Sequence, residues 1–315
     1  METFYNKNGI SSTKPTNNDF WILEWSNQFS INAKDISGDL DFALIALTHK
    51  LQSKLFGSPQ TFFNKLMTRT TWLSYAGIDA EIKISKVEFE KLVINNNTEE
   101  TNKFLYYYDV NNIVGSLQNL VQESKYLFCE FYKILNVNSF MLQPKPFEED
   151  SLMFASGQLV TNIFSTINHL FINLASQLDF MTKVCIEFEN YPTSFTSYPR
   201  LKCKDILFGD AKRIRNIPFE NTVFEKSDKI QLILSLRNDI IHNSSFENIP
   251  KVYQQFKNWE MIEKYILIPD TTNGHFDTFK NRNRFFNNDV KLNEILPDLI
   301  FEFWNKLMTT IKLVN

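Results

Sequence analysis

The sequence predicts an all-α fold, mainly helical from end to end, and three observations lead to this prediction. The chain has 315 residues but only 8 glycines, so it has few of the residues that tight turns between strands need. Apolar residues make up 43% and charged residues 22%, close to the averages of globular proteins. Apolar residues also recur at helical spacing in several long segments. At this length, one large domain or two ordinary ones are expected.

The first half of the chain is expected to be mostly helical. Residues 1–20 are polar and lack apolar anchors, so we expect a frayed terminus. The segments Leu40 to Leu55 and Thr61 to Tyr75 carry helical periodicity and predict a helical hairpin. Ala80 to Ile94 fits either a strand or a helix. Phe104 to Leu135 predicts one long helix or two shorter ones.

A break in the periodic pattern predicts where the chain divides. The stretch Gln143 to Asp150 contains two prolines and ends in three consecutive acidic residues. Such a stretch is typical of a boundary between compact regions. We therefore expect an N-terminal, mostly helical region over residues 1–145 and a C-terminal helical domain over residues 150–315.

The second half carries the strongest helical patterns. Leu159 to Phe188 predicts a long helix with one apolar face, and a loop-rich stretch from Pro192 to Lys226 follows it. Ser227 is placed to cap the next helix, which is expected from Asp228 to about Asn243. A final helix is expected from about Glu294 to Leu313, with Pro297 in its first turn.

Charge and cysteine content restrict the class of protein. The net charge of −3 and pI of about 5.9 give no overall basic field, so any nucleic-acid site must be local. The three cysteines have no paired spacing, which excludes a zinc ribbon and suits reduced thiols in the cytoplasm. The N-terminus lacks the apolar core of a signal peptide, and no stretch approaches about 18 uninterrupted apolar residues. We expect a cytoplasmic protein that is neither exported nor membrane-spanning.

The helix predicted after Ser227 combines an apolar arc with a group of polar side chains. Arg237 falls in the middle of the arc, where a guanidinium needs an anion or several acceptors as partners. Asn238 and His242 lie four residues apart on the edge of the arc, beside the arginine, while Asp239 points away. The arc consists of Ile230, Ile233, Leu234, Ile240 and Ile241.

These three polar residues suit chemistry at a phosphodiester. The arginine can donate two hydrogen bonds to phosphate oxygens and stabilise negative charge in a transition state. The histidine can transfer a proton near neutral pH, because the unperturbed pKa of histidine is about 6.5. The asparagine can orient the imidazole or the phosphate. We therefore predict Arg237, Asn238 and His242 as catalytic residues.

The run from Arg237 to His242, RNDIIH, resembles the Arg-Asn-x-x-x-His signature of HEPN domains, the higher-eukaryote and prokaryote nucleotide-binding family. The resemblance covers about residues 150–315, through this motif and a compatible order of helices, and does not extend to residues 1–145. It implies a helical bundle that carries the signature on its penultimate or last long helix. It also implies a homodimer in which two signature helices form one composite site.

The function that the resemblance implies is metal-independent cleavage of RNA through a 2′,3′-cyclic phosphate. By analogy with the family, the setting is that of a toxin of a toxin–antitoxin pair, or of an antiphage or abortive-infection effector. The partners expected are RNA, a second copy, and an antitoxin or other regulatory protein, with residues 1–145 sensing a trigger or restraining the nuclease. His169 is interpreted as a histidine at the edge of the core, and His49 and His275 show no metal-ligand spacing, so no metal and no cofactor are expected.

Other interpretations of the motif remain open. Arg237 can be a core arginine paired with a carboxylate such as that of Asp179, and His242 a residue favoured by the helix dipole at a C-terminal end. A non-catalytic HEPN module that binds RNA, nucleotide or a partner protein is a second hypothesis. A helical assembly protein with a chance motif is a third.

Two basic segments are further candidates for RNA binding. In the first, basic side chains precede the signature helix in a loop, a pattern that suits phosphate contacts. In the second, basic residues alternate with phenylalanines, a pattern that can follow a nucleic-acid backbone and stack on bases, although a solvated loop is the favoured interpretation. The candidates are Lys212, Arg213 and Arg215 in the first segment, and Lys280, Arg282 and Arg284 in the second.

Overall fold

The computed structural model divides the chain into two compact units. Unit 1 consists of Met1–Ser37, Gln122–Ser176 and Glu225–Lys306, and unit 2 of Gly38–Val121, Gln177–Phe224 and Leu307–Asn315. The structure describes residues 2–15, 20–26, 28–32, 35–76, 81–140 and 148–314. Each unit combines segments from before and after the boundary predicted near residues 145–150, of which residues 145–147 lie outside the described residues.

The chain is a mixed α/β protein, so the prediction of an all-α fold is wrong. Its described residues form long helices together with three small antiparallel sheets, in the strand orders β1-β2-β3, β4-β5-β6 and β7-β8. The strands have between 2 and 6 residues each. Strands this short carry too few alternations to stand out against helical periodicity, which explains the error.

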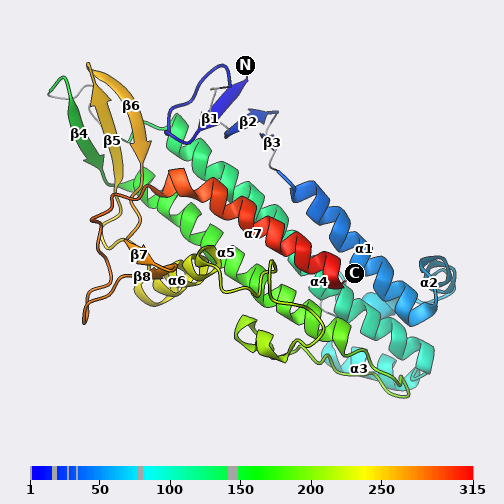
Figure 1. The fold of residues 1–315 in the computed structure, drawn as a ribbon. Coiled ribbons are helices and arrows are strands. Elements are labelled where there is room, and N and C mark those ends of the chain that lie inside the picture. Colours follow the sequence, from blue (N-terminus) through cyan, green and yellow to red (C-terminus); the bar gives the residue numbers. More distant parts are fainter. Residues whose placement is uncertain are drawn as a thin grey trace. The chain divides into compact units, whose positions relative to one another are not determined.

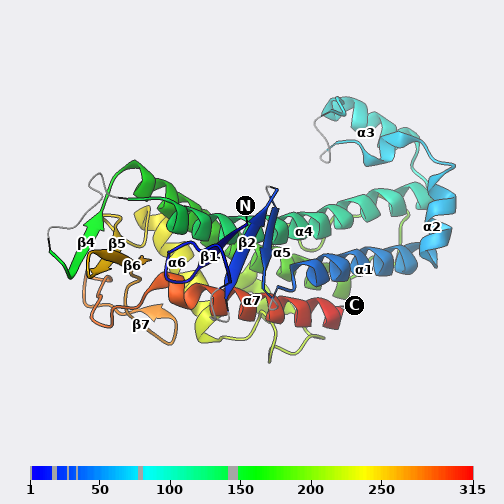
Figure 2. The ribbon, with the colours of Figure 1, turned by 90° about the horizontal axis from the view of Figure 1, so that it is seen from above.

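Unit 2 begins with α1 (Ser37–Phe56), which confirms the first predicted helix. The second predicted helix is shorter than expected, because α2 (Pro59–Leu66) is followed by a single 3₁₀ turn, η1 (Thr71–Ser74). In Figure 2, α2 turns the chain between the end of α1 and α3 (Lys86–Asn95). The segment that fitted a strand or a helix is therefore helical from Lys86 onward, and residue 80 at its start lies outside the described residues.

Three long helices contribute residues to both units and match the strongest sequence patterns. They are α4 (Glu99–Val137), α5 (Gln158–Glu189) and α7 (Leu292–Val314). The pattern over α4 fitted one long helix or two short ones, and the structure has one. The apolar face predicted for α5 is buried: Ile163, Ile167, Leu170, Leu174 and Leu178 are fully inaccessible to solvent.

Helix α7 starts earlier than expected, which places Pro297 beyond its first turn. A proline inside a helix lacks the N–H that would bond the carbonyl four residues before it. That carbonyl belongs to Asn293, and the hydroxyl of Tyr132 donates a hydrogen bond to it at 2.5 Å. The tyrosine thereby satisfies the acceptor that the proline leaves without its helical partner.

The N-terminus of unit 1 is ordered into a sheet, so the prediction of a frayed end is wrong. Strand β1 (Thr3–Asn6) pairs with β2 (Trp21–Trp25), which pairs with β3 (Gln28–Ile31). Phe4 and Tyr5 are buried and supply the apolar anchor. The predicted frayed segment also includes residues 16–19, which lie outside the described residues.

The second sheet of unit 1 consists of β4 (Ser151–Ala155), β5 (Val252–Lys257) and β6 (Glu260–Tyr265), side by side in Figure 1. Strands β5 and β6 are joined by a two-residue turn, Asn258 and Trp259, with φ angles of 50° and 66°. Positive φ at both positions is the geometry of the turns that best fit strand twist. Here neither position is a glycine.

Lys264 in β6 is a buried lysine at the C-terminal end of α4. Lys264 is 4% exposed, and its Nζ donates hydrogen bonds to the carbonyls of Asn136 (2.8 Å) and Asn138 (2.9 Å). Carbonyls at the C-terminal end of a helix lack N–H donors within the helix, so the ammonium group satisfies them. Burial lowers the pKa of Lys264 from 10.5 to about 8.

The lowered pKa of Lys264 predicts a pH-dependent stability. Between pH 8 and 10.5 the unfolded chain binds more protons at this site than the folded chain, so its contribution to stability rises with pH across this window. We expect wild type to gain about 2 kcal/mol relative to Lys264→Met between about pH 8 and pH 10. Urea unfolding of both proteins at the two pH values measures this difference, and taking the difference cancels the tyrosine titrations that they share. Parallel pH dependences would contradict the prediction.

The third sheet is a small hairpin that packs on α6 (Asp228–Asn243). Strands β7 (Thr271–Thr272) and β8 (His275–Phe276) are joined by Asn273 and Gly274, and the hairpin lies beside α6 in Figure 1. A Cβ atom at Gly274, whose φ is +77°, would lie 2.1 Å from the carbonyl oxygen of Asp228. Only glycine therefore permits this close approach of the turn to the first turn of the helix.

This close approach predicts that Gly274→Ala destabilises unit 1. The added methyl group would push the hairpin away from α6, a cost of about 1–3 kcal/mol beyond the strain of the left-handed conformation. Gly57→Ala is the matched control, because Gly57 has a φ of +89°, close to that of Gly274, but nothing within 4 Å of its Cβ position. Thermal unfolding should show a larger loss for Gly274→Ala. Equal losses would mean that the contact with Asp228 contributes nothing.

Candidate active site

Helix α6 carries the predicted catalytic residues and has the bounds that the sequence predicted. Its first turn is capped by Ser227, whose Oγ accepts a hydrogen bond from the N–H of Ile230 at 3.5 Å. Its last residue is followed by Ser244 in the left-handed conformation, with a φ of 66°. The buried positions of the helix are Ile230, Leu232, Ile233, Leu236, Asp239 and Ile240.

The three motif side chains reach the surface of this helix. Arg237 is partly buried, whereas Asn238 and His242 are exposed. The guanidinium Nη1 of Arg237 donates a hydrogen bond to Oδ1 of Asn238 at 3.0 Å. His242 lies one helical turn beyond Asn238, so the two side chains share one side of the helix. The three groups thus lie along one exposed edge of α6.

Arg237 forms no ion pair with any carboxylate in the described part of the chain. Asp179, the acidic partner in the alternative interpretation, accepts a hydrogen bond from the backbone N–H of Phe208 at 2.7 Å. The guanidinium of Arg237 therefore keeps donors for an external anion. The alternative interpretation of His242 stays open, since it does lie in the last turn of the helix.

Asp239, expected to point into solvent, is instead 6% exposed. Its Oδ1 accepts hydrogen bonds from the amide groups of Asn243 (2.6 Å) and Asn283 (3.0 Å), and its Oδ2 accepts one from Nη2 of Arg284 (2.8 Å). A carboxylate can be buried when donors satisfy both oxygens. The segment that follows β8 supplies two of these donors, which is why the helical projection alone gave the wrong environment.

Arg284 fixes the chain where α6 ends. Besides its ion pair with Asp239, its guanidinium donates to the carbonyls of Ser245 (2.8 Å) and Phe246 (3.0 Å). The ring of Phe246 in turn stacks on Phe164 of α5, with centroids 5.2 Å apart. The Arg284 side chain is only 16% exposed. Arg284 was predicted to contact RNA, but its guanidinium instead bonds Asp239 of α6 and the chain just after the helix, next to His242 in the sequence.

The other two basic candidates of this segment are exposed. The backbones of Phe279 and Arg282 exchange hydrogen bonds at 2.8 and 2.9 Å, which closes a tight turn. The ammonium group of Lys280 lies 5.5 Å from the centre of the Phe279 ring, and that ring is 65% exposed. This turn of unit 1 therefore presents cations beside an aromatic face to solvent.

The first basic group, Lys212, Arg213 and Arg215, lies in unit 2. Lys212 and Arg213 end the short 3₁₀ helix η2 (Phe208–Arg213), and Arg215 follows it. All three side chains are exposed, and all three line one surface hollow together with Lys202. Lys202 belongs to the same loop, but no sequence pattern places it beside the other three.

Several features of the described residues bear on cofactors and compartment. Among them, no three His, Cys, Asp or Glu side chains gather closely enough to hold a metal ion. No described helix combines the length and hydropathy that a bilayer-spanning segment needs.

Cys129, Cys185 and Cys203 are all buried and unpaired. Burial, and the neighbouring Glu187 carboxylate, raise the pKa of the Cys203 thiol to about 12, so this thiol is unreactive.

Comparison of the chain with protein-family models, with curated protein sequences and with solved structures found no match. The assignment of a function therefore depends on the motif residues and on their environment in this structure.

Proposed function

We propose that the chain is a metal-independent endoribonuclease whose active-site residues are Arg237, Asn238 and His242 on α6. The observation that supports this most strongly is the contrast along the end of the helix. Asp239 is buried and bonded to the partly buried Arg284, whereas the three motif side chains reach the surface, and Arg237 has no carboxylate partner within the described residues. A helix end fixed in this way holds reactive groups in constant positions.

In the proposed reaction, the 2′-hydroxyl of a ribose attacks the adjacent phosphorus while His242 accepts the hydroxyl proton. The bond from phosphorus to the 5′-oxygen breaks, and a 2′,3′-cyclic phosphate and a 5′-hydroxyl form after a proton reaches the leaving oxygen. Arg237 binds the phosphate oxygens and stabilises their developing charge. Asn238 already accepts a hydrogen bond from Arg237 and so orients the guanidinium. DNA lacks the 2′-hydroxyl and is not a substrate.

The proposal includes a second copy of the chain. The resemblance to HEPN domains implies a composite site in which two α6 helices meet, with the two His242 side chains within about 15 Å across a two-fold axis. Ile241, within the motif, is 48% exposed. An apolar side chain at the surface between Asn238 and His242 in the sequence supports an isologous contact there.

The biological setting that we propose follows from the family analogy alone. In that setting the protein acts in the cytoplasm on RNA as a toxin or an antiphage effector, and an antitoxin or another regulatory protein restrains it. Residues 1–145, including the sheet of β1, β2 and β3, would respond to the trigger.

One experiment tests the proposed function directly. Purified protein is incubated with total RNA in excess chelator, beside a His242→Ala control, and the 3′ ends of any fragments are analysed. Fragments with cyclic phosphate ends in the wild-type sample alone support the proposal. Intact RNA that remains bound to the wild-type protein would favour the non-catalytic binding module instead.

A further inference from the structure

The long loop between α5 and α6 is held in place by acidic side chains of α5, all within unit 2. The carboxylate of Asp179 bonds the N–H of Phe208, where η2 begins. Two more carboxylates, those of Glu187 and Glu189, lie in the last turn of α5 and bond other parts of the same loop. A loop held at three points by backbone hydrogen bonds presents its side chains in defined positions.

Glu187 anchors the segment that carries Lys202. It is fully buried, and its Oε2 accepts hydrogen bonds from the N–H groups of Lys202 (2.8 Å) and Cys203 (3.1 Å). Its Oε1 accepts a hydrogen bond from the hydroxyl of Tyr106 at 2.6 Å. Burial and this carboxylate raise the pKa of Tyr106 far above its usual value, so the hydroxyl remains a donor. Both carboxylate oxygens are thus satisfied inside the unit.

Glu189 anchors the segment that carries Arg215. Its two oxygens accept hydrogen bonds from the N–H of Arg215 at 3.0 and 3.2 Å, and Oε1 also accepts one from the N–H of Asn216 at 2.8 Å. These bonds use the backbone of Arg215 and leave its guanidinium free to extend. The negative charge of Glu189 is correspondingly directed at the loop backbone.

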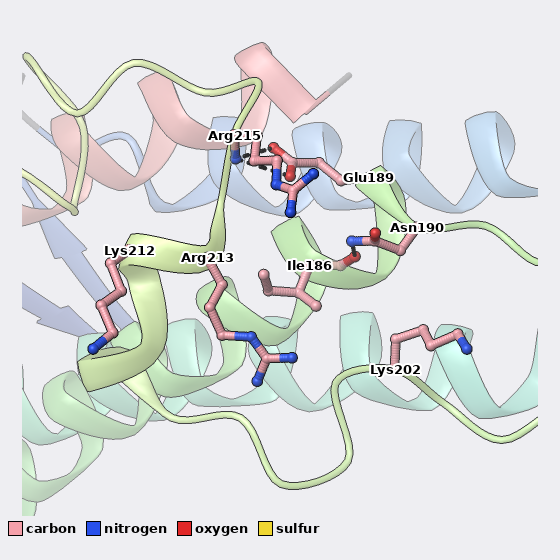
Figure 3. A pocket seen from close by; sticks show the side chains of 7 residues that line it. All are labelled: Ile186, Glu189, Asn190, Lys202, Lys212, Arg213 and Arg215. Carbon is pink, nitrogen blue, oxygen red and sulfur yellow. Dashed lines mark hydrogen bonds between the residues drawn. The ribbon is translucent and has the colours of Figure 1, made fainter.

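The anchored segments enclose a hollow of about 440 Å³ with a strong excess of positive charge. Its charged lining is formed by four cations and one carboxylate, namely Lys202, Lys212, Arg213, Arg215 and Glu189. Arg213 and Arg215 both line the hollow, and in Figure 3 their guanidinium groups lie on opposite sides of the Ile186 side chain. Within the described residues, none of the four cations forms an ion pair with an acidic side chain.

We propose that this hollow is a binding site for phosphate groups of a polyanionic ligand. Two guanidinium groups in the lining of one hollow offer forked donors that match phosphate oxygens, and the two lysines add further positive charge. The side chains need no release from internal partners, so binding does not cost an existing ion pair. Among the described residues that line the hollow none is aromatic, so they offer no aromatic ring on which a base could stack. Recognition is therefore of phosphate charge rather than of base identity.

Phosphates of this kind come from two sources, the backbone of a single-stranded RNA or a free oligophosphate group. The proposal is independent of the chemistry assigned to α6, because it concerns binding in unit 2 and not cleavage. The test is therefore made in the His242→Ala protein, in which bound RNA is expected to stay intact. The probes are a short fluorescent single-stranded RNA and inorganic tripolyphosphate.

The informative variant is Arg213→Gln with Arg215→Gln, compared with the control Arg200→Gln with Lys204→Gln. Both double variants lose two positive charges from exposed positions of the same loop, but only the first pair lines the hollow. We expect the first variant to raise the Kd of at least one probe by roughly tenfold more than the control does. For RNA, the slope of log K against log salt should also fall by about one to two.

Each result has a definite meaning. Weaker binding of RNA alone assigns the hollow to a nucleic-acid backbone, and weaker binding of tripolyphosphate alone assigns it to a free oligophosphate group. Both effects together show that phosphate is recognised from either source. Equal Kd changes in the two double variants, or no change in either, would overturn the proposal. Because all four replaced side chains are exposed, melting temperatures should be unchanged, and they serve as the check on folding.

Discussion

Replacement of His242 by alanine is expected to reduce RNA cleavage by about 10²–10⁴-fold, because it removes the group that transfers the proton. Arg237→Ala is expected to lose a comparable factor, since it removes stabilisation of the charge that develops on the phosphate. The His242 side chain is exposed and Arg237 is only partly buried, so both variants should keep the wild-type melting temperature. The initial rate of cleavage of a labelled RNA measures the loss of activity in each variant. Thermal unfolding measures whether the melting temperature is unchanged.

Two control variants separate catalysis from general charge or folding effects. His169→Ala removes another histidine of unit 1, with a side chain 54% exposed, and should leave the rate unchanged. Arg237→Lys keeps the positive charge but loses the forked donors, so it should recover only part of the lost rate. A fully active His242→Ala protein would show that the histidine has been given the wrong role.

We also expect the wild-type protein to cleave RNA in excess chelator, because the same mechanism uses no metal ion. The described residues offer no cluster of metal ligands, and the proposed mechanism assigns neutralisation of the phosphate charge to Arg237. Cleavage that disappears with chelator and returns with a divalent ion would contradict this assignment, even if His242 were essential.

The helices could be predicted from the sequence because their signals are local. The apolar face of α5 repeats along a helix of 32 residues, about nine turns, and Ser227 marks the start of α6 in the sequence as it does in the structure. Tertiary packing then only reinforces what the periodicity specifies. The start of α7, near Pro297, was harder to predict, since the hydroxyl that compensates for the proline comes from Tyr132, a residue far away in the chain.

The strands were missed because the scarcity of glycine was taken to mean a scarcity of turns. Several left-handed positions in this chain are occupied by asparagine instead, as at Asn221, Asn258 and Asn273. Asparagine tolerates this conformation better than most residues, so an Asn-rich chain can form tight turns with few glycines. The pair Asn273-Gly274 was a usable signal, since it is among the strongest sequence marks of a two-residue hairpin.

The candidate site shows the same division between local and distant information. The sequence placed Arg237, Asn238 and His242 on one helix, and the structure confirms that location. It could not place Asp239, because its environment depends on Arg284, 45 residues later. It also could not show that Lys202 and Arg215 line one hollow, since the backbone bonds to Glu187 and Glu189 that bring them there have no periodic pattern.

Loss of the ion pair between Asp239 and Arg284 is expected to cost more stability than any other single change in the segment that follows β8. Their side chains are 5% and 16% exposed, and removal of one partner from a buried pair leaves the other charge without compensation. For Arg284→Gln we expect a loss on the order of 3 kcal/mol, because the variant leaves the Asp239 carboxylate buried and also frees the carbonyls of Ser245 and Phe246. Urea and thermal unfolding measure this loss.

Arg282→Gln is the matched control, because Arg282 is exposed, lies two residues away and loses the same charge. Its melting temperature should equal that of the wild type. Since Arg284 holds the turn after α6, Arg284→Gln should also slow RNA cleavage, and Asp239→Ala should do the same although it removes a negative charge. A variant that lost an RNA contact would instead bind RNA more weakly at unchanged stability. That result for Arg284→Gln would make Arg284 a ligand for RNA and not the residue that positions the end of α6.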